Sequence, residues 1–193
     1  MRIPTALTLL RLFISPAFLL LYVYHDALGL GSVLLPWILL LLWGVSELSD
    51  AFDGYLARRF NQVTDLGKVL DPMADSISHL VAFLTFTAQP VNLPIYLVLL
   101  LLYRDSMVST LRTVCALRGF ALAARTSGKV KAIILAITIG GILGMMIPHS
   151  LGYLSTAKLQ FASLILASVG VGYTVLSGLE YFFAHWNELR KMF

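Results

Sequence analysis

The chain has 193 residues, of which 59% are hydrophobic and 12% are charged, and its mean hydropathy is +0.85. These values exclude an ordinary water-soluble globular protein and indicate one integral membrane domain, residues 1–193. The formal net charge of +4 could indicate nucleic-acid binding, but in a membrane chain it reflects topology, and we expect no nucleic-acid partner.

Apolar segments of the length that a membrane helix needs, about 20 residues, recur along the whole chain. Residues 27–46 and 159–179 qualify outright, whereas the third segment qualifies only if Asp71 and Asp75 are tolerated within a span. We therefore predict an all-α integral membrane protein with six transmembrane helices. They cover residues 12–24 with the upstream turns from Pro4, then 27–46, 69–88, 93–117, 132–148 and 159–179.

The basic residues predict the orientation in the membrane. With a cytosolic N-terminus, eleven Lys and Arg residues fall at cytosolic helix ends or in cytosolic loops, and only Lys158 lies in a loop on the other side. Both termini are therefore predicted to be cytosolic, in a bacterial inner membrane. An N-terminal signal peptide is disfavoured because Ser15-Pro16 interrupts the apolar run. The eleven residues are Arg2, Arg11, Arg58, Arg59, Lys68, Arg118, Arg125, Lys129, Lys131, Arg190 and Lys191.

Four of the ten acidic residues form two pairs at helical spacing, Asp50 with Asp53 and Asp71 with Asp75. Spacings of three and four place the members of each pair on one face of a helix. Charged groups within a membrane span are expensive and usually functional. The two pairs are therefore the first candidates for a functional site.

Both pairs are predicted to lie at the same depth. If one helix ends near Arg59 and the next begins near Gly67, the carboxylates lie roughly 6–13 Å inside the helix ends. Four facing carboxylates cannot all stay ionised without a counter-charge, and an all-oxygen cluster suits Mg²⁺, Mn²⁺ or Ca²⁺. We predict a divalent-metal site, the alternative being ordinary solvated acids at helix ends that reach cytosolic water.

The stretch also carries a family resemblance. It reads Asp50-x2-Asp53-Gly54-x2-Ala57-Arg58-x8-Gly67-x3-Asp71-x3-Asp75, which resembles the signature of the CDP-alcohol phosphotransferase family. All eight fixed residues are present, over 26 positions. A motif that bridges the second and third of six spans, with a cytosolic N-terminus, is similar to the architecture of that family.

The resemblance implies an enzyme that joins an alcohol to CDP-diacylglycerol and releases CMP. It implies that the four aspartates hold two divalent metal ions, Mg²⁺ or Mn²⁺, and that Asp75 is the catalytic general base. Membrane lipids and a second copy of the chain, in a homodimer, are the other implied partners. The implied contacts to the CDP-lipid are Thr5, Thr8, Gly54, Ala57, Arg58, Thr64 and Gly67.

The second half of the chain indicates which alcohol is used. Residues 103–112 and 127–132 resemble segments of the glycerophosphate branch of the family, which implies phosphatidyl transfer to glycerol 3-phosphate and a product phosphatidylglycerol phosphate. Inositol 1-phosphate or another alcohol is the nearest alternative, and an ion-binding transporter is the alternative from another class. The residues predicted to bind the acceptor phosphate are Arg104, Arg112, Lys129 and Lys131.

Two further charged residues are predicted to lie deep in their helices. Glu47 precedes Asp50 by one turn, and Arg104 lies roughly 20 Å from the cytosolic end of the fourth helix. We expect them to neutralise each other across the second and fourth helices. The alternative is that Arg104 pairs with Asp105 and that Glu47 faces the polar cavity.

Overall fold

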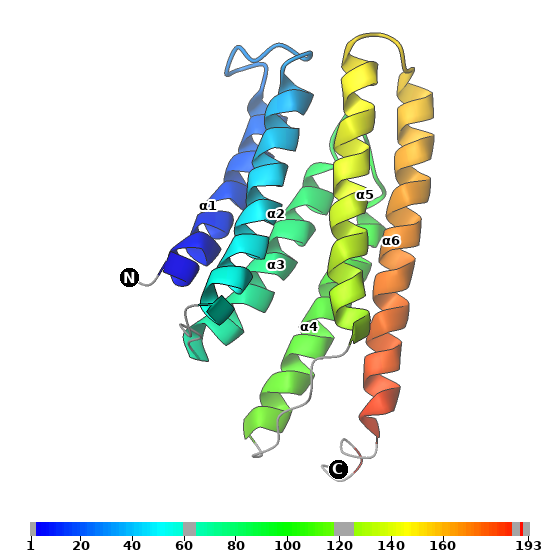
Figure 1. The fold of residues 1–193 in the computed structure, drawn as a ribbon. Helices are drawn as coiled ribbons and strands as arrows, with labels where there is room; N and C mark the ends of the chain where they lie inside the picture. The colour runs from blue at the N-terminus through cyan, green and yellow to red at the C-terminus, as the bar shows by residue number, and fades with distance from the viewer. Residues whose placement is uncertain (1–2, 60–64, 118–125, 187–189, 191–193) are drawn as a thin grey trace.

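A computed structural model describes residues 3–59, 65–117, 126–186 and 190, without the side chains of 3–7, 53–58 and 65–69. In these ranges the regular structure is entirely α-helical, as predicted. Six long helices alternate in direction (Figure 1). They are α1 (Ile3–Tyr24), α2 (Leu35–Arg59), α3 (Asp65–Thr85), α4 (Ile95–Leu117), α5 (Thr126–Ser150) and α6 (Thr156–Ala184).

The ends of α2 and α4 agree with the sequence, whereas the starts of α2 and α3 differ. α2 ends at Arg59, and α4 continues through its charged residues to Leu117, as predicted. α2 begins only at Leu35, eight residues after the start of the predicted span 27–46, because the residues before it form turns in which Gly29 adopts a φ of 68°. α3 begins at Asp65, two residues before the predicted start at Gly67. An acidic residue is favourable in the first turn because it complements the positive end of the helix dipole. Asp65 therefore belongs to the helix and not to the preceding turn.

The earlier start of α3 keeps the two acidic pairs level. Counted from Asp65, Asp71 and Asp75 lie about 9 and 15 Å along α3, while Asp50 lies about 13 Å from the end of α2. Pro72 lies within α3, beyond its first turn, so its missing N–H removes one backbone hydrogen bond of the helix, which nevertheless continues to Thr85. The aspartates of both helices therefore occupy one layer of the bundle.

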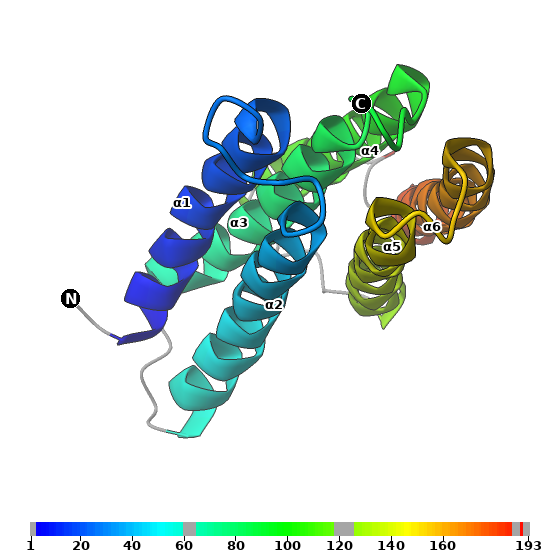
Figure 2. The same ribbon diagram turned by 90° about the horizontal axis from the view of Figure 1, so that it is seen from above.

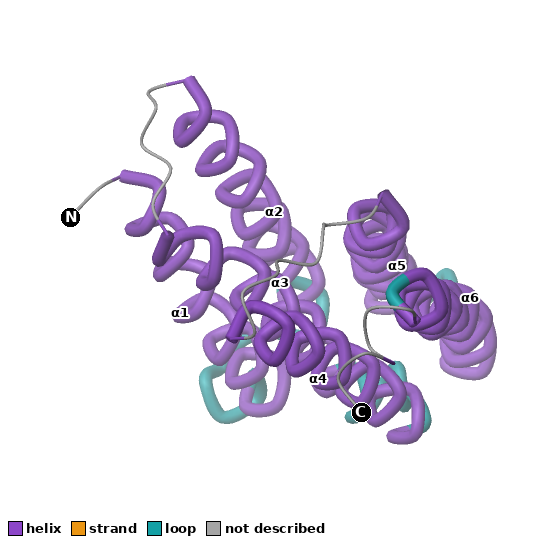
Figure 3. Tube along the Cα trace, turned by 90° about the horizontal axis from the view of Figure 1, so that it is seen from below, coloured by secondary structure: helices purple, strands orange, loops and turns teal. Residues whose placement is uncertain are grey.

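The helices pack in two groups. α1 packs against both α2 and α3, and α5 packs against α6 and α2, while α4 packs against α6 and α3. Seen from above, α1, α2 and α3 lie together, with α5 and α6 side by side (Figure 2). The start of α1, the end of α2 and the start of α3 come together at one end of the bundle (Figure 3). This end is where the sequence places the aspartates.

Three of the six helices are long and apolar enough to cross a membrane: α2 over Leu35–Phe52, α5 and α6. α1 contains a shorter apolar stretch, Thr8–Tyr24. α3 and α4 carry charged residues along their length, which lowers their hydropathy. Large apolar side chains face outward from the bundle, as expected of a surface in contact with lipid. Among the most exposed are Phe13, Leu41, Ile137, Phe161, Val169 and Leu176.

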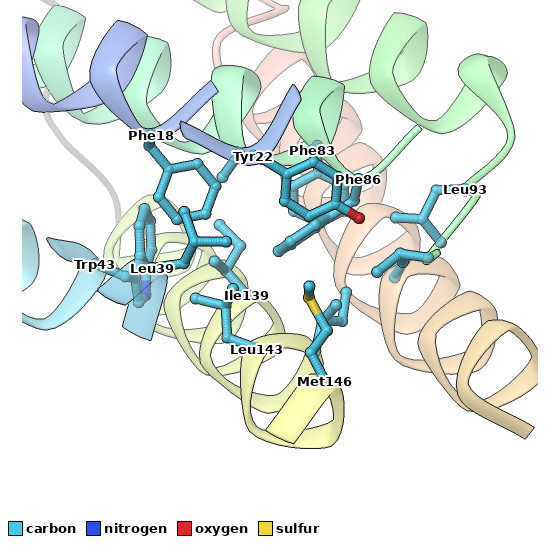
Figure 4. Packing of buried hydrophobic residues seen from close by; sticks show 14 of the residues in the cluster. Phe18, Tyr22, Leu39, Trp43, Phe83, Phe86, Leu93, Ile139, Leu143 and Met146 are labelled. Carbon is cyan, nitrogen blue, oxygen red and sulfur yellow. The ribbon is translucent and has the colours of Figure 1, made fainter. Parts of the chain in front are cut away.

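The apolar core fills the half of the bundle remote from the aspartates. Phe86, the first residue after α3, contacts Phe18 and Tyr22 of α1 edge-to-face, with ring centroids 6.3 Å apart in each pair. Leu39 of α2 and Leu143 of α5 lie on the facing side of this cluster (Figure 4). Tight packing of this kind holds the helices together, because lipid provides no hydrophobic driving force between them.

Buried polar side chains occupy the other half of the α1–α3 group. Seven of them lie between the apolar core and the aspartates. They are Thr8, Arg11, Ser15, Ser46, Ser49, Ser78 and His79. Two of these, Ser15 and Ser78, join α1 to α3 by a hydrogen bond of 2.9 Å between their hydroxyls. The interior is therefore apolar at one end and polar at the end that holds the candidate site.

Close packing of α5 on α6 depends on one glycine. A Cβ atom at Gly170 would lie 2.8 Å from Oγ1 of Thr138, whereas a Cβ at Gly172 would have no neighbour within 4 Å. We expect Gly170→Val to destabilise the fold by about 1–3 kcal/mol, as overpacking does in a filled core. Thermal unfolding in detergent, followed by tryptophan fluorescence, measures this. Gly172→Val is the matched control, and equal unfolding temperatures of the two variants would contradict the packing argument.

Candidate active site

Three carboxylates of the predicted metal site come together between α2 and α3. Asp71 and Asp75 of α3 both lie within electrostatic range of Asp50 of α2. Asp53 follows Asp50 by three residues on the same helix, but its side chain lies outside the described residues. The two acidic helices therefore bring three described carboxylates near enough to interact electrostatically, and their assignment as metal ligands stays a prediction.

Helix α1 joins the two acidic helices. Thr8 Oγ1 donates a hydrogen bond of 2.7 Å to Asp71 Oδ1, and Arg11 Nη1 donates a charged hydrogen bond to Asp50 Oδ1. Thr8 and Arg11 are three residues apart, which puts them on one face of α1. Arg11 is 2% exposed. The sequence placed Arg11 only among the basic residues at cytosolic helix ends and in cytosolic loops, whereas the structure buries its guanidinium as the counter-ion of an aspartate.

The third described carboxylate, that of Asp75, has a different partner. Nδ1 of His79 lies 2.9 Å from the carbonyl oxygen of Asp75 and 3.2 Å from its Oδ1. The other side of the His79 ring meets Trp43 of α2 edge-to-face, with centroids 5.6 Å apart. His79 was missed in the sequence, although its spacing of four from Asp75 places it on the same helix face.

A second polar cluster joins α4, α5 and α6. Asp105 accepts hydrogen bonds from Arg104 Nη1 at 2.8 Å and from Lys131 Nζ at 3.1 Å to each carboxylate oxygen. Arg104 Nη2 also donates to Ser177 Oγ at 2.9 Å. A Cβ at Gly178 would lie 2.8 Å from Arg104 Cγ, so the absence of a side chain there makes room for the arginine. This cluster is named the basic cluster below.

The predicted ion pair between Glu47 and Arg104 is wrong. The guanidinium of Arg104 bonds to Asp105, the next residue along the chain, and to Ser177. Glu47 lies instead within electrostatic range of Asp50, Asp75 and His79, so it faces the acidic site. The packing of α4 against α6, which the sequence does not specify, places Ser177 next to Arg104 and favours the Arg104–Asp105 pair over the Glu47–Arg104 pair.

The other two residues predicted to bind the acceptor phosphate, Arg112 and Lys129, lie in different surroundings. Arg112 lies over the ring of Tyr181, 5.2 Å from its centroid, and its Nε donates to the tyrosine hydroxyl oxygen at 3.3 Å. Lys129 is exposed at the start of α5. A cavity of about 680 Å³ between α3 and α4 is lined by Arg104 and Arg112 and by Ser76, the neighbour of Asp75. The two arginines therefore line one cavity with Asp105 and with residues of α3, although none of the described aspartates of the acidic site lines it.

Lys131 connects the two polar clusters. Its side chain is 4% exposed, and its ammonium group, bonded to Asp105, is also within electrostatic range of Asp75. For several residues predicted to bind the CDP-lipid, the structure gives no contacts. Thr64 lies outside the described residues, and only the helical backbone is described at Thr5, Gly54, Ala57, Arg58 and Gly67. Their assignment to CDP-lipid binding stays a prediction.

Comparison with known proteins assigns the family. A family model described as CDP-alcohol phosphatidyltransferase matches residues 1–176. This chain belongs to that family. Membership confirms the interpretation of the aspartate signature as a family signature. The match covers all six helices apart from the last turns of α6.

Curated members of the family are similar over almost the full chain. A Bacillus subtilis protein named CDP-diacylglycerol--glycerol-3-phosphate 3-phosphatidyltransferase is 32% identical, over 97% of both chains. A Rickettsia typhi protein of the same name is 30% identical, over 93% of this chain and 94% of its own. A Mycobacterium tuberculosis protein named probable phosphatidylglycerophosphate synthase is 29% identical, over 91% of this chain and 77% of its own.

The acidic site has the donor chemistry of a divalent-metal site. Its ligand candidates are all carboxylates, the oxygen donors that Mg²⁺ and Mn²⁺ prefer. Within the described side chains, which exclude Asp53, no three acidic, His or Cys groups form a closed ligand set. Asp50 is instead neutralised by Arg11. The buried guanidinium shows that Asp50 requires a compensating positive charge.

We expect Arg11→Met to destabilise the metal-free protein by about 1–3 kcal/mol, because Asp50 would lose its charged hydrogen-bond partner. Adding Mn²⁺ should then raise the unfolding temperature of the variant more than that of the wild type. Thermal unfolding in EDTA and in Mn²⁺ tests both statements. Lys158→Met, at an exposed lysine of the opposite end, is the control, and an identical response of the two variants would refute the counter-ion role.

Proposed function

We propose that this chain transfers the phosphatidyl group of CDP-diacylglycerol to glycerol 3-phosphate, releasing CMP and forming phosphatidylglycerol phosphate. The names of relatives about 30% identical over more than nine-tenths of the chain support this reaction. The structural observation that carries the proposal is the position of Lys131 between Asp105 and Asp75. It puts a cluster suited to a phosphate next to the carboxylates suited to a diphosphate.

Four aspartates would hold the divalent ions of the reaction: Asp50, Asp53, Asp71 and Asp75. Two such ions, Mg²⁺ or Mn²⁺, would neutralise the diphosphate and stabilise the charge on the attacking and leaving oxygens. Thr8 supports the arrangement by fixing one oxygen of Asp71. Phosphoryl transfer needs mainly such positioning and charge stabilisation, so rigid carboxylates on two packed helices suit the reaction.

Asp75 is the proposed general base. The acceptor hydroxyl would attack the phosphorus that bears the diacylglycerol group, and Asp75 would take its proton. The bond from this phosphorus to the bridging oxygen breaks, and CMP leaves with the electron pair. The depth of the aspartates, about 9–15 Å from the helix ends, lets the lipid keep its acyl chains in the leaflet during the reaction.

The charge of the basic cluster favours a phosphorylated acceptor. Arg104 and Lys131 share the single negative charge of Asp105, which leaves one net positive charge, and Arg112 adds another at the same cavity. A phosphate monoester carries about −1.5 to −2 charges at pH 7 and would compensate both. A neutral acceptor such as serine would leave them unpaired. Inositol 1-phosphate meets the same charge requirement and remains the alternative acceptor.

We also infer the topology and assembly of the enzyme. Six spans in one membrane domain, residues 1–193, would place both termini and the aspartates in the cytosol, at a bacterial inner membrane. The basic residues at the aspartate end and the exposed Lys158 at the other end support this orientation. A homodimer, expected from the family resemblance, stays a prediction that the mass of the detergent-solubilised protein would test.

The purified protein should release CMP from labelled CDP-diacylglycerol when Mg²⁺ or Mn²⁺ and glycerol 3-phosphate are supplied. In parallel reactions, inositol 1-phosphate and serine should support much less CMP release. Inositol 1-phosphate has a phosphate but no glycerol backbone, and serine has neither. Mass spectrometry of the lipid product identifies the acceptor. CMP release with inositol 1-phosphate alone would show that the acceptor is inositol 1-phosphate and not glycerol 3-phosphate. No CMP release with any alcohol would overturn the proposed reaction.

Replacing the base separates chemistry from metal binding. We expect Asp75→Asn to lower kcat by about 10²–10⁴-fold, because the amide cannot accept the acceptor's proton, while much of the Mn²⁺ binding remains. Initial rates of CMP release and Mn²⁺ titration measure the two effects. Asp26→Asn, at an exposed aspartate of the opposite end, should change neither. Turnover by Asp75→Asn at the wild-type rate would remove Asp75 from the mechanism.

A further inference from the structure

His79 is a buried polar residue that the proposed reaction does not use. Its side chain is 2% exposed, in the layer between the apolar core and the aspartates. Trp43 of α2 covers one side of its ring, edge-to-face at 5.6 Å. Burying an imidazole costs free energy unless hydrogen bonds compensate. An apolar side chain would fill this place against Trp43 equally well, so the polarity of His79 requires another reason.

Within the part of the chain that the structure describes, His79 has polar contacts with Asp75 alone. Nδ1 is 2.9 Å from the carbonyl oxygen of Asp75, which can only accept, so Nδ1 carries the hydrogen and donates it. Oδ1 of Asp75 lies 3.2 Å from the same nitrogen, close enough for an electrostatic contact with the carboxylate. Nε2 is buried and has no hydrogen-bond partner among the residues that the structure describes. His79 therefore does not link helices through hydrogen bonds, and its donor serves Asp75.

The surroundings of Asp75 make this contact important. Glu47 and Asp50 of α2 carry negative charge near it, and Lys131 of α5 and Arg11 of α1 carry positive charge. The negative groups repel the carboxylate, and the positive groups attract it from two different helices. A donor on the same helix, one turn away, can hold the carboxylate against these opposing forces because helix geometry keeps the two residues at constant spacing.

We propose that His79 is a positioning residue, whose Nδ1–H holds the carboxylate of Asp75 in the orientation needed for metal binding and proton transfer. The inference rests on the proposed function of Asp75. Groups that orient a metal-binding side chain typically contribute about 10–100-fold to metal affinity or activity. His79 touches neither substrate nor metal in this scheme and acts only through Asp75.

Three substitutions separate the donor from the bulk of the ring. His79→Leu fills the space but removes the donor. His79→Asn places an amide NH₂ near the position of Nδ1, and His79→Gln places it nearer that of Nε2. His149→Leu is the control, because Nδ1 of His149 also contacts a carbonyl oxygen, that of Leu154 at 2.8 Å, at the opposite end of α5.

Each variant is purified at full length in detergent for three measurements. They are Mn²⁺ affinity by electron paramagnetic resonance without substrates, kcat and KM for CMP release, and the unfolding temperature. We expect His79→Leu to lower kcat by about 10–100-fold and Mn²⁺ affinity by at least about 3-fold, with both KM values within about 2-fold of wild type. Its unfolding temperature should be equal or higher, since a buried nitrogen without a partner is removed.

The His79→Asn variant shows whether His79 acts by donating a hydrogen bond to Asp75 or only by filling space. His79→Asn should restore kcat and Mn²⁺ affinity to within about 3-fold of wild type, and His79→Gln should resemble His79→Leu. Wild-type values in His79→Leu would overturn the proposal, and so would equal losses in His79→Asn and His79→Leu. If His79→Leu does not fold, the comparison of His79→Asn with His79→Gln replaces it. Higher kcat and Mn²⁺ affinity in His79→Asn would support the proposal, and equal values in the two variants would overturn it.

Failure of the proposed function has a different signature. Wild-type protein that neither binds Mn²⁺ nor releases CMP would refute the function of the acidic site, and the inference with it. Wild-type protein that does both, with a His79→Leu variant that does both equally well, would refute only the role of His79.

Discussion

Negative charge concentrated between α2 and α3 is the constraint on which the site depends. The three described aspartates are partly exposed, yet they interact electrostatically with one another, and like charges at such separations require compensation. Each is compensated differently: Asp50 by the buried Arg11, Asp71 by the hydroxyl of Thr8, and Asp75 by the imidazole of His79. These contacts come from α1 and α3, so the packing of α1 on its two neighbours is part of the site.

The distribution of packing explains how such a site is kept in place. The aromatic contacts of Phe86 with Phe18 and Tyr22 hold α1 against α3 at the end remote from the acids. Between this core and the aspartates lies a layer of buried hydroxyls, including the Ser15–Ser78 contact. The acidic helices are thus held by apolar packing on one side, while hydrogen bonds orient the side chains that the reaction would use.

Two charge clusters of opposite character meet at Lys131. Asp105 binds both Lys131 and Arg104, which lets α4, α5 and α6 bury two cations next to one another without leaving them unpaired. The same arrangement keeps one net positive charge near Asp75. In the proposed reaction, the aspartates with their metal ions would hold the diphosphate of the donor and the basic cluster would hold the phosphate of the acceptor, and the proximity of the two clusters would suit direct transfer.

The sequence by itself determined the helices, the depth of the aspartates and the family, because hydrophobic length and residue spacing are properties of a single chain segment. The tertiary structure alone decided the partners of the charged residues. Arg11 proved to be a buried counter-ion, and Arg104 binds Asp105 and not Glu47. His79 follows Asp75 by one turn, yet its burial under Trp43 of another helix gave it significance. Such pairings depend on how helices rotate and pack against one another, which no local pattern specifies.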